Sequence, residues 1–297
     1  MIVEHPSRAL FVLLCICTGC AKGPYVFSRF EHAPDAAPMN VVVEYGKPMK
    51  RLDRMAWVIG IPKRILPLNA KIDNHQISAE TTAKLVTFLE ENDLADIHVY
   101  VNHYDPRGQW QRMRENTSVG AGWRYSLGTV SWLGYTLLPS RVFGGDTYNP
   151  YTNSIYLNSD VPAIVLKEAA YAKDVHTRVY PGSYVAVTGL PVFSLRRSIH
   201  NANDVFGYAR EHQDWEMERQ AYHVLYPQLG SEATSLGAPL VTSVGWWAGP
   251  AVGFSGAAVG HVTGRAIAKR RDAEVNGSKS PDADGLEEPQ TAGPQEP

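Results

Sequence analysis

Glu168 stands in the run of residues with the clearest chemical potential in this chain, between Lys167 and Ala169. Tyr171 follows it one helical turn later. A carboxylate in such a position acts as the general base for a metal-bound water when nearby side chains hold the metal. A second acidic run carries further carboxylates, at Asp214, Glu216 and Glu218. These two runs form the candidate site.

The elements that must position Glu168 are a turn, a strand and a helix. Residues 149–153, Asn-Pro-Tyr-Thr-Asn, predict the turn. The strand follows at once, and we expect it at the edge of a sheet: Ser154, Ile155, Tyr156 and Leu157. The helix is then predicted over 163–175, with Asp160 as its cap and Pro162 in its first turn.

A similar unit is predicted earlier in the chain. Ser78 is expected to cap a helix on which Leu85, Phe88 and Leu89 form one apolar face. Apolar residues then alternate with polar ones over 97–102, which predicts a half-buried strand. Together these elements predict an α+β fold, with a mainly helical body and a small sheet over residues 41–231.

Less regular segments complete this body. Residues 41–43 and 56–59 are predicted to be short buried stretches. Residues 119–143 are rich in Gly, Trp and Leu, and we expect them to form a packed, irregular connection with short pieces of helix or strand.

The order of strand and helix resembles that of gluzincin-type zinc metallopeptidases, notably the CAAX-processing and heat-shock protease group. The resemblance covers roughly residues 77–226 and implies a zincin-like body. In that family the edge strand holds the substrate backbone, the next helix carries H-E-x-x-H, and a later acidic helix supplies the third ligand. The resemblance makes Glu168 a vestigial base and implies five degenerate metal positions, at Lys167, Tyr171, Asp214, Glu216 and Glu218.

The departures from the family pattern decide the expected chemistry. Lys167 stands where the first histidine is needed, and an ammonium group has no lone pair for a metal. Tyr171 replaces the second histidine, and a phenol is a poor ligand. Carboxylates alone do not make the usual site of two histidines and one carboxylate. We therefore expect no metal, no cofactor and no catalysis, and instead binding of an extended peptide or envelope protein by strand addition.

Three other interpretations stay open. In the first, the chain is an active metal-dependent endopeptidase in which Glu168 joins the acidic run in a non-standard ligand set. In the second, it is a structural envelope lipoprotein. In the third, the likeness is accidental and the helix is an ordinary amphipathic one. Within the main interpretation, Glu168 is expected to pair with Lys167 or another base, Tyr171 to fill the ligand space, and Asp214 or Glu218 to pair with bases such as Arg210 or Arg219.

The N-terminus has the order of an export signal. A short segment ending at Arg8 is followed by an apolar run over 9–17 and by small residues before Cys20. This pattern resembles a bacterial lipoprotein signal, so residues 1–19 are predicted to be a signal peptide, Cys20 to be lipidated and 20–40 to be a linker. We expect a membrane-anchored protein of the cell envelope with its body outside the cytoplasm.

Near the C-terminus, Asp, Glu, Lys and Arg are absent between Glu232 and Arg265. Glycines recur there at a spacing of four in two runs: Gly245, Gly249 and Gly253, then Gly256, Gly260 and Gly264. Because such spacing lets helices approach closely in lipid, residues 233–268 are predicted to form a membrane helix or hairpin that also mediates self-association. The alternative is a Gly-rich hairpin packed on the body. Residues 269–297 are predicted to be a basic flank and a disordered acidic tail.

Composition limits the remaining function classes. The chain has 28 Lys and Arg against 30 Asp and Glu, a formal charge of -2. Such a balance offers no global basic field, so we expect no nucleic-acid partner. The 44% hydrophobic content is enough for a core.

Overall fold

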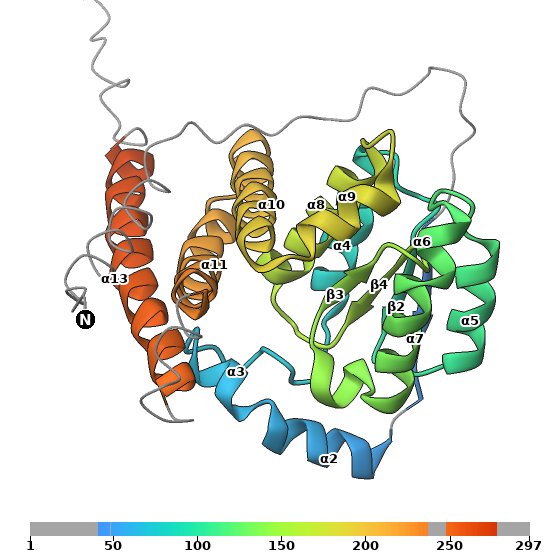
Figure 1. The fold of residues 1–297 in the computed structure, drawn as a ribbon. Helices are drawn as coiled ribbons and strands as arrows, with labels where there is room; N and C mark the ends of the chain where they lie inside the picture. The colour runs from blue at the N-terminus through green and yellow to red at the C-terminus, as the bar shows by residue number, and fades with distance from the viewer. Residues whose placement is uncertain (1–40, 48, 237–247, 278–297) are drawn as a thin grey trace, which may run out of the picture.

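The computed structural model describes residues 41–47, 49–236 and 248–277 (Figure 1). The predicted signal peptide, Cys20, the linker up to residue 40, Gly245 and the tail from 278 lie outside the described residues.

The sheet has four strands in the order β1-β2-β4-β3. Their bounds are Val42–Tyr45 for β1, His98–Val101 for β2, Thr147–Asn149 for β3 and Ser154–Leu157 for β4. β1, β2 and β4 are parallel, whereas β3 pairs with β4 in the antiparallel sense. The α+β class and the mainly helical body are therefore confirmed.

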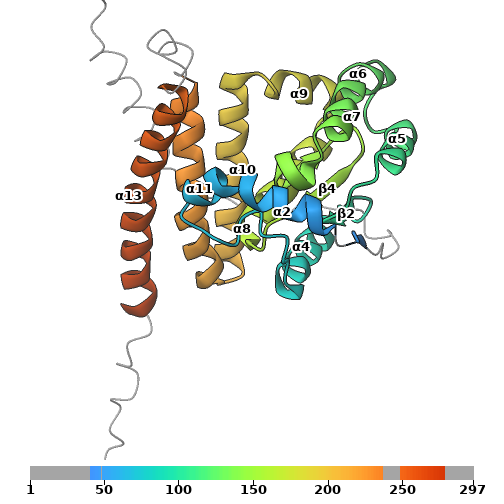
Figure 2. The ribbon, with the colours of Figure 1, turned by 90° about the horizontal axis from the view of Figure 1, so that it is seen from below.

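Helices surround this sheet (Figures 1 and 2). Their bounds are Lys50–Ile59 (α2), Ile61–Ile65 (α3), Ala79–Glu91 (α4), Pro106–Glu115 (α5), Ala121–Tyr125 (α6), Leu127–Leu137 (α7), Pro162–His176 (α8), Pro181–Thr188 (α9), Pro191–Glu211 (α10), Trp215–Ser235 (α11) and Ala248–Gly277 (α13). A short π-helical turn, η1, spans Ser140–Gly144. Residues 119–143, predicted to be irregular, are thus mostly helical.

α8 is the centre of the core. It packs against α4, α10 and α11, and it also contacts β3 and β4. Val165, Leu166 and Ala169 are fully buried. A helix covered on several sides must be apolar around most of its circumference, and small residues such as Ala169 and Ala170 let its neighbours approach.

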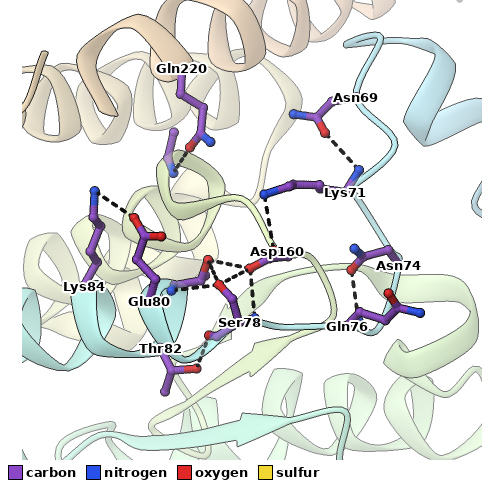
Figure 3. Close-up of polar contacts among 12 residues, drawn as sticks. Asn69, Lys71, Asn74, Gln76, Ser78, Glu80, Thr82, Lys84, Asp160 and Gln220 are labelled. Atoms are coloured by element: carbon purple, nitrogen blue, oxygen red, sulfur yellow. Dashed lines mark hydrogen bonds and ion pairs between the residues drawn. The ribbon is translucent and has the colours of Figure 1, made fainter. Parts of the chain in front are cut away.

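Asp160 does not cap α8, contrary to the prediction. The residue before that helix is Val161, whose side chain makes no capping hydrogen bond, and the N–H of Ala163 in the first turn donates to Gln220 Oε1 at 3.2 Å. Asp160 instead accepts hydrogen bonds on Oδ1 from the Ser78 backbone N–H (2.9 Å), the Ser78 hydroxyl (2.6 Å) and the Thr81 hydroxyl (2.6 Å), as Figure 3 shows for Ser78. Desolvation opposes its ionisation, but these hydrogen bonds lower the pKa of Asp160 to about 2. Ser78 does cap α4, because its Oγ accepts from Thr81 N.

The strand predicted to lie at the sheet edge lies inside the sheet. β4 has β2 on one side and β3 on the other, and Ser154, Ile155, Tyr156 and Leu157 are all buried. Its backbone groups are therefore used by two neighbours, and β4 cannot receive a peptide by strand addition. The prediction of a peptide-binding edge at 154–157 is therefore wrong. β4 pairs with β2, which lies more than fifty residues earlier in the chain, and local sequence patterns do not show such a distant partner.

The described part of the Gly-rich segment is the start of α13, which packs along α11 of the same chain. A Cβ placed on Gly256 would lie 2.1 Å from Gly230 O, and one on Gly260 would lie 2.3 Å from Tyr226 O. At Gly264 the distance to Tyr222 O would be 2.2 Å. Gly256, Gly260 and Gly264 therefore pack on α11 of the same chain, and self-association through these helices stays a prediction.

The predicted span over 233–268 is described only in part, at 233–236 and 248–268. α11 runs through to Ser235, and α13 continues to Gly277, beyond the predicted start of a basic flank at 269. Among the residues that the structure describes, no helix combines the length and the hydropathy needed to cross a bilayer.

Candidate functional site

Lys167 and Glu168 line a pocket of about 280 Å³. α8 supplies one wall, the residues just before β3 a second, the last turns of α11 a third, and α3 with the segment after it a fourth. The ionisable groups in its lining are Lys63, Asp73, Asp146, Lys167, Glu168 and Glu232. The pocket therefore mixes four acids with two lysines.

Lys167 faces α11 across this pocket. Its Nζ lies 3.8 Å from Glu232 Oε1, and its side chain is 12% exposed. The cationic amine thus stands at the position where the family pattern would need an imidazole. It neutralises a carboxylate and offers no lone pair.

Glu168 is turned towards the edge of the sheet. Its Oε2 accepts the backbone N–H of Tyr148 in β3 at 3.1 Å. Desolvation raises the pKa of Glu168, against the opposing effects of Lys167 and of this hydrogen bond. Glu168 therefore satisfies a backbone donor on β3, the strand that does lie at this edge. A peptide strand added to β3 would have to displace that carboxylate.

Tyr171 fills the space next to β3 and α10. Its ring meets the Tyr148 ring edge-on, with centroids 5.5 Å apart, and the Arg197 guanidinium lies 4.3 Å from its centroid. Burial raises the pKa of the Tyr171 phenol. A neutral phenol beneath a guanidinium is a packed aromatic residue, and a metal cation there would meet the charge of Arg197.

The acidic run on α11 is held away from this pocket. Glu218 and Glu232 are fourteen residues apart on one helix, which is about 20 Å at 1.5 Å per residue. Glu218 pairs with Arg210 (2.8 Å) and Arg271 (3.2 Å). Desolvation alone would raise the pKa of Glu218, but these two arginines lower it overall. The pairing of Glu218 with Arg210 is the one that the sequence predicted for these two residues.

Asp214 and Glu216 stand at the same distant end of α11. Asp214 caps the helix by accepting from Met217 N at 3.0 Å, and it pairs with Lys84 at 2.7 Å. Glu216 lies in the first turn. The predicted grouping of Asp214, Glu216 and Glu218 with Glu168 is therefore wrong, because these acids lie at the start of α11 whereas the pocket of Glu168 on α8 is lined by the last turns of α11.

The donor set does not fit the zinc that the family resemblance implies. Lys167 carries no lone pair, Tyr171 is covered by Arg197, and the proposed third ligands point elsewhere. Over the described ranges, no three His, Cys, Asp or Glu side chains come together as a metal site.

Asp146 is a site residue that the sequence did not reveal. Its Oδ1 accepts the backbone N–H groups of Asn158 (2.8 Å) and Ser159 (3.1 Å). Desolvation nevertheless raises the pKa of Asp146 to about 7, with a contribution from the nearby charge of Asp73. Asp73 is buried and pairs with Lys63 at 3.2 Å.

No known protein family, curated protein or solved structure matches this chain. The function therefore has to be argued from the pocket itself.

Glu232 and Asp146 were missed for different reasons. Glu232 is the last acid before the charge-free run, and its place opposite Lys167 depends on how α11 crosses α8. Asp146 follows two glycines just before β3, a position typical of a turn. In both cases only the tertiary fold brings the carboxylate to Glu168.

Proposed function

We propose that this chain is an exported protein, anchored in the cell envelope through Cys20, that binds a peptide at the Glu168 pocket without hydrolysing it. The pair formed by Lys167 and Glu232 carries the proposal, because it puts an ammonium group where a zincin-like body would need a metal ligand. The order of β4 and α8 is in keeping with such a body. We assign the anchor to Cys20 because the glycines of α13 already pack on α11.

The chemistry of the pocket favours a cationic side chain of the peptide. Lys63 is paired with Asp73, and Lys167 with Glu232, so the charges of these four groups balance. Asp146 and Glu168 remain as the two further acids in the lining, both with raised pKa values. An ammonium or guanidinium group between these carboxyls would favour their ionised forms, so we expect affinity to rise from pH 6 to pH 8.

Fluorescence anisotropy with labelled hexapeptides tests this proposal. The probes are an alanine hexapeptide with a central Lys and matched peptides with a central Glu or Leu. We expect the Lys peptide to bind best, and Glu168→Gln and Asp146→Asn to weaken it about tenfold or more, as loss of a charge-assisted contact does. Glu115→Gln, on an exposed residue of α5, is the matched control and should bind as the wild type does.

Two results would refute the proposal. Equal binding of the three peptides, or none, would favour the structural lipoprotein. Stoichiometric zinc in the purified chain, together with peptide cleavage that Glu168→Gln abolishes, would favour the endopeptidase.

A further inference from the structure

Residues 47–71 carry a charge imbalance that the whole chain does not show. Seven residues in this segment are basic and only Asp53 is acidic, although the formal charge of the chain is -2. The basic residues are Lys47, Lys50, Arg51, Arg54, Lys63, Arg64 and Lys71. Lys63 pairs with Asp73 and Lys71 with Asp160, so the positive charge that remains belongs to Arg64, Lys47 and the three basic residues of α2.

Large apolar side chains are exposed among these charges. Met55, Trp57 and Val58 on α2 are 51%, 57% and 55% exposed, and Ile61 and Ile65 on α3 are exposed as well. The sequence predicted that residues 56–59 would be buried, but only Ala56 is fully covered. α2 thus turns Ala56 inward and Met55, Trp57 and Val58 outward, with Leu52 and Ile59 half-buried. A helix that only covers a core does not expose so many large apolar residues.

The inward face of α2 is fixed to the body by Arg141. This buried guanidinium binds Asp53 at 2.7 Å and also donates to the Lys47 carbonyl at 2.9 Å. The one acid of the segment is thereby neutralised from inside. Figure 2, the view from below, shows α2 lying across the near side of the body, and Figure 1 shows α2 and α3 along its lower border.

We infer that the outward surface of α2 and α3 lies on an anionic lipid surface. This basic-apolar surface is defined by Lys50, Arg51, Arg54, Trp57, Val58 and Ile61. Helices that lie in the plane of a membrane interface combine Trp and aliphatic residues with Lys and Arg in this way. Each basic group near an anionic membrane contributes about 1 kcal/mol, which corresponds to about a fivefold gain in binding.

A second copy of this chain is a poorer occupant of the same surface. A symmetric contact brings the same patch of both copies together, so the basic groups of one would face those of the other. The charge of the surface therefore favours a partner of opposite sign. The inference does not depend on an anchor at Cys20. It also does not depend on peptide binding, because the basic-apolar surface is separate from the Glu168 pocket.

A local probe tests the contact in the full chain. All three cysteines lie within the first twenty residues, so replacing Cys15, Cys17 and Cys20 by Ser leaves a chain ready for a single label. Val58→Cys carries an environment-sensitive dye, and Val179→Cys, at an 85% exposed site, is the matched control. With vesicles of phosphatidylglycerol and phosphatidylethanolamine, we expect the dye at 58 to move to shorter wavelength and to be quenched by spin-labelled lipid. The dye at 179 should do neither.

Charge and apolar variants complete the test by vesicle sedimentation. Changing Lys50, Arg51 and Arg54 together to Gln should lower binding to anionic vesicles about 100-fold and leave binding to phosphatidylcholine vesicles unchanged. Trp57→Glu with Val58→Glu should weaken binding, whereas Val179→Glu with Tyr180→Glu, also exposed, should not.

Three outcomes would overturn the inference. The dye at 58 stays unresponsive to vesicles, the dyes at 58 and 179 respond alike, or the dye at 58 responds to protein concentration without vesicles. The last outcome would assign the surface to a second copy.

Discussion

Asp146→Asn separates the charge of the pocket from its hydrogen bonds. The Asn side chain keeps an oxygen that accepts from Asn158 N and Ser159 N, but it cannot ionise. In the folded wild type, desolvation raises the pKa of Asp146 from 3.8 to about 7. The folded chain therefore retains a proton that the unfolded chain has released, and the wild type loses stability as pH rises between these two values.

The size of this effect follows from the two pKa values. At about 1.4 kcal/mol for each pKa unit, the difference between 3.8 and about 7 amounts to about 4 kcal/mol at high pH. About 3 kcal/mol of this arises between pH 5 and pH 8, because at pH 5 only the unfolded chain has titrated. The Asn variant lacks this loss.

Urea unfolding at pH 5 and pH 8 measures the difference. The stability of Asp146→Asn relative to wild type should be about 3 kcal/mol more favourable at pH 8 than at pH 5. Glu115→Gln, on an exposed acid, controls for general charge effects. If the difference between Asp146→Asn and wild type is the same at both pH values, Asp146 does not titrate as argued and the electrostatics proposed for the pocket are wrong.

Three further predictions concern the elements around the site. Asp160→Asn should lower the free energy of unfolding by about 2 kcal/mol at pH 7 and by little at pH 2. The depressed pKa of about 2 stabilises the wild type above pH 4, and this stabilisation is lost as pH falls. Circular dichroism during acid titration measures the effect, and an equal cost at both pH values would contradict it. Asp214→Ala should lower the free energy of unfolding by about 1–2 kcal/mol, because α11 loses its cap. EDTA should leave the melting temperatures of the wild type and the variant unchanged. A chelator effect confined to the wild type would instead make Asp214 a metal ligand. Gly260→Ala should destabilise the chain by about 2 kcal/mol or more, because the new Cβ would meet Tyr226 O. Gly134→Ala, in open space on α7, should stabilise the chain by up to about 1 kcal/mol. If both variants shift the melting temperature in the same direction, the packing argument is wrong.

Local sequence signals predicted the elements near the site well. The apolar spacing of Leu85, Phe88 and Leu89 gave α4, and the alternation after residue 97 gave β2. Both features depend on residues a few positions apart, where periodicity is informative. The strand at 154–157 and the helix after it were found for the same reason.

Long-range partners decided what the sequence did not show. Asp160 looked like a cap of the helix beside it, but its hydrogen-bond donors are Ser78 and Thr81, about eighty residues earlier. The glycine pattern predicts close helix packing in lipid and in water alike, so the spacing did not identify the partner helix. In the structure the partner is α11, where Gly230 lies opposite Gly256.

α3 takes part in two surfaces at once. Lys63 and the neighbouring Leu66 line the Glu168 pocket, while Ile61 belongs to the basic-apolar surface and Ile65 is exposed as well. In the proposed orientation, one helix diameter separates the pocket wall from the lipid headgroups. A ligand would then be encountered by diffusion along the membrane plane, and a weak intrinsic affinity would suffice for a partner held in the same bilayer, because tethering raises its effective concentration.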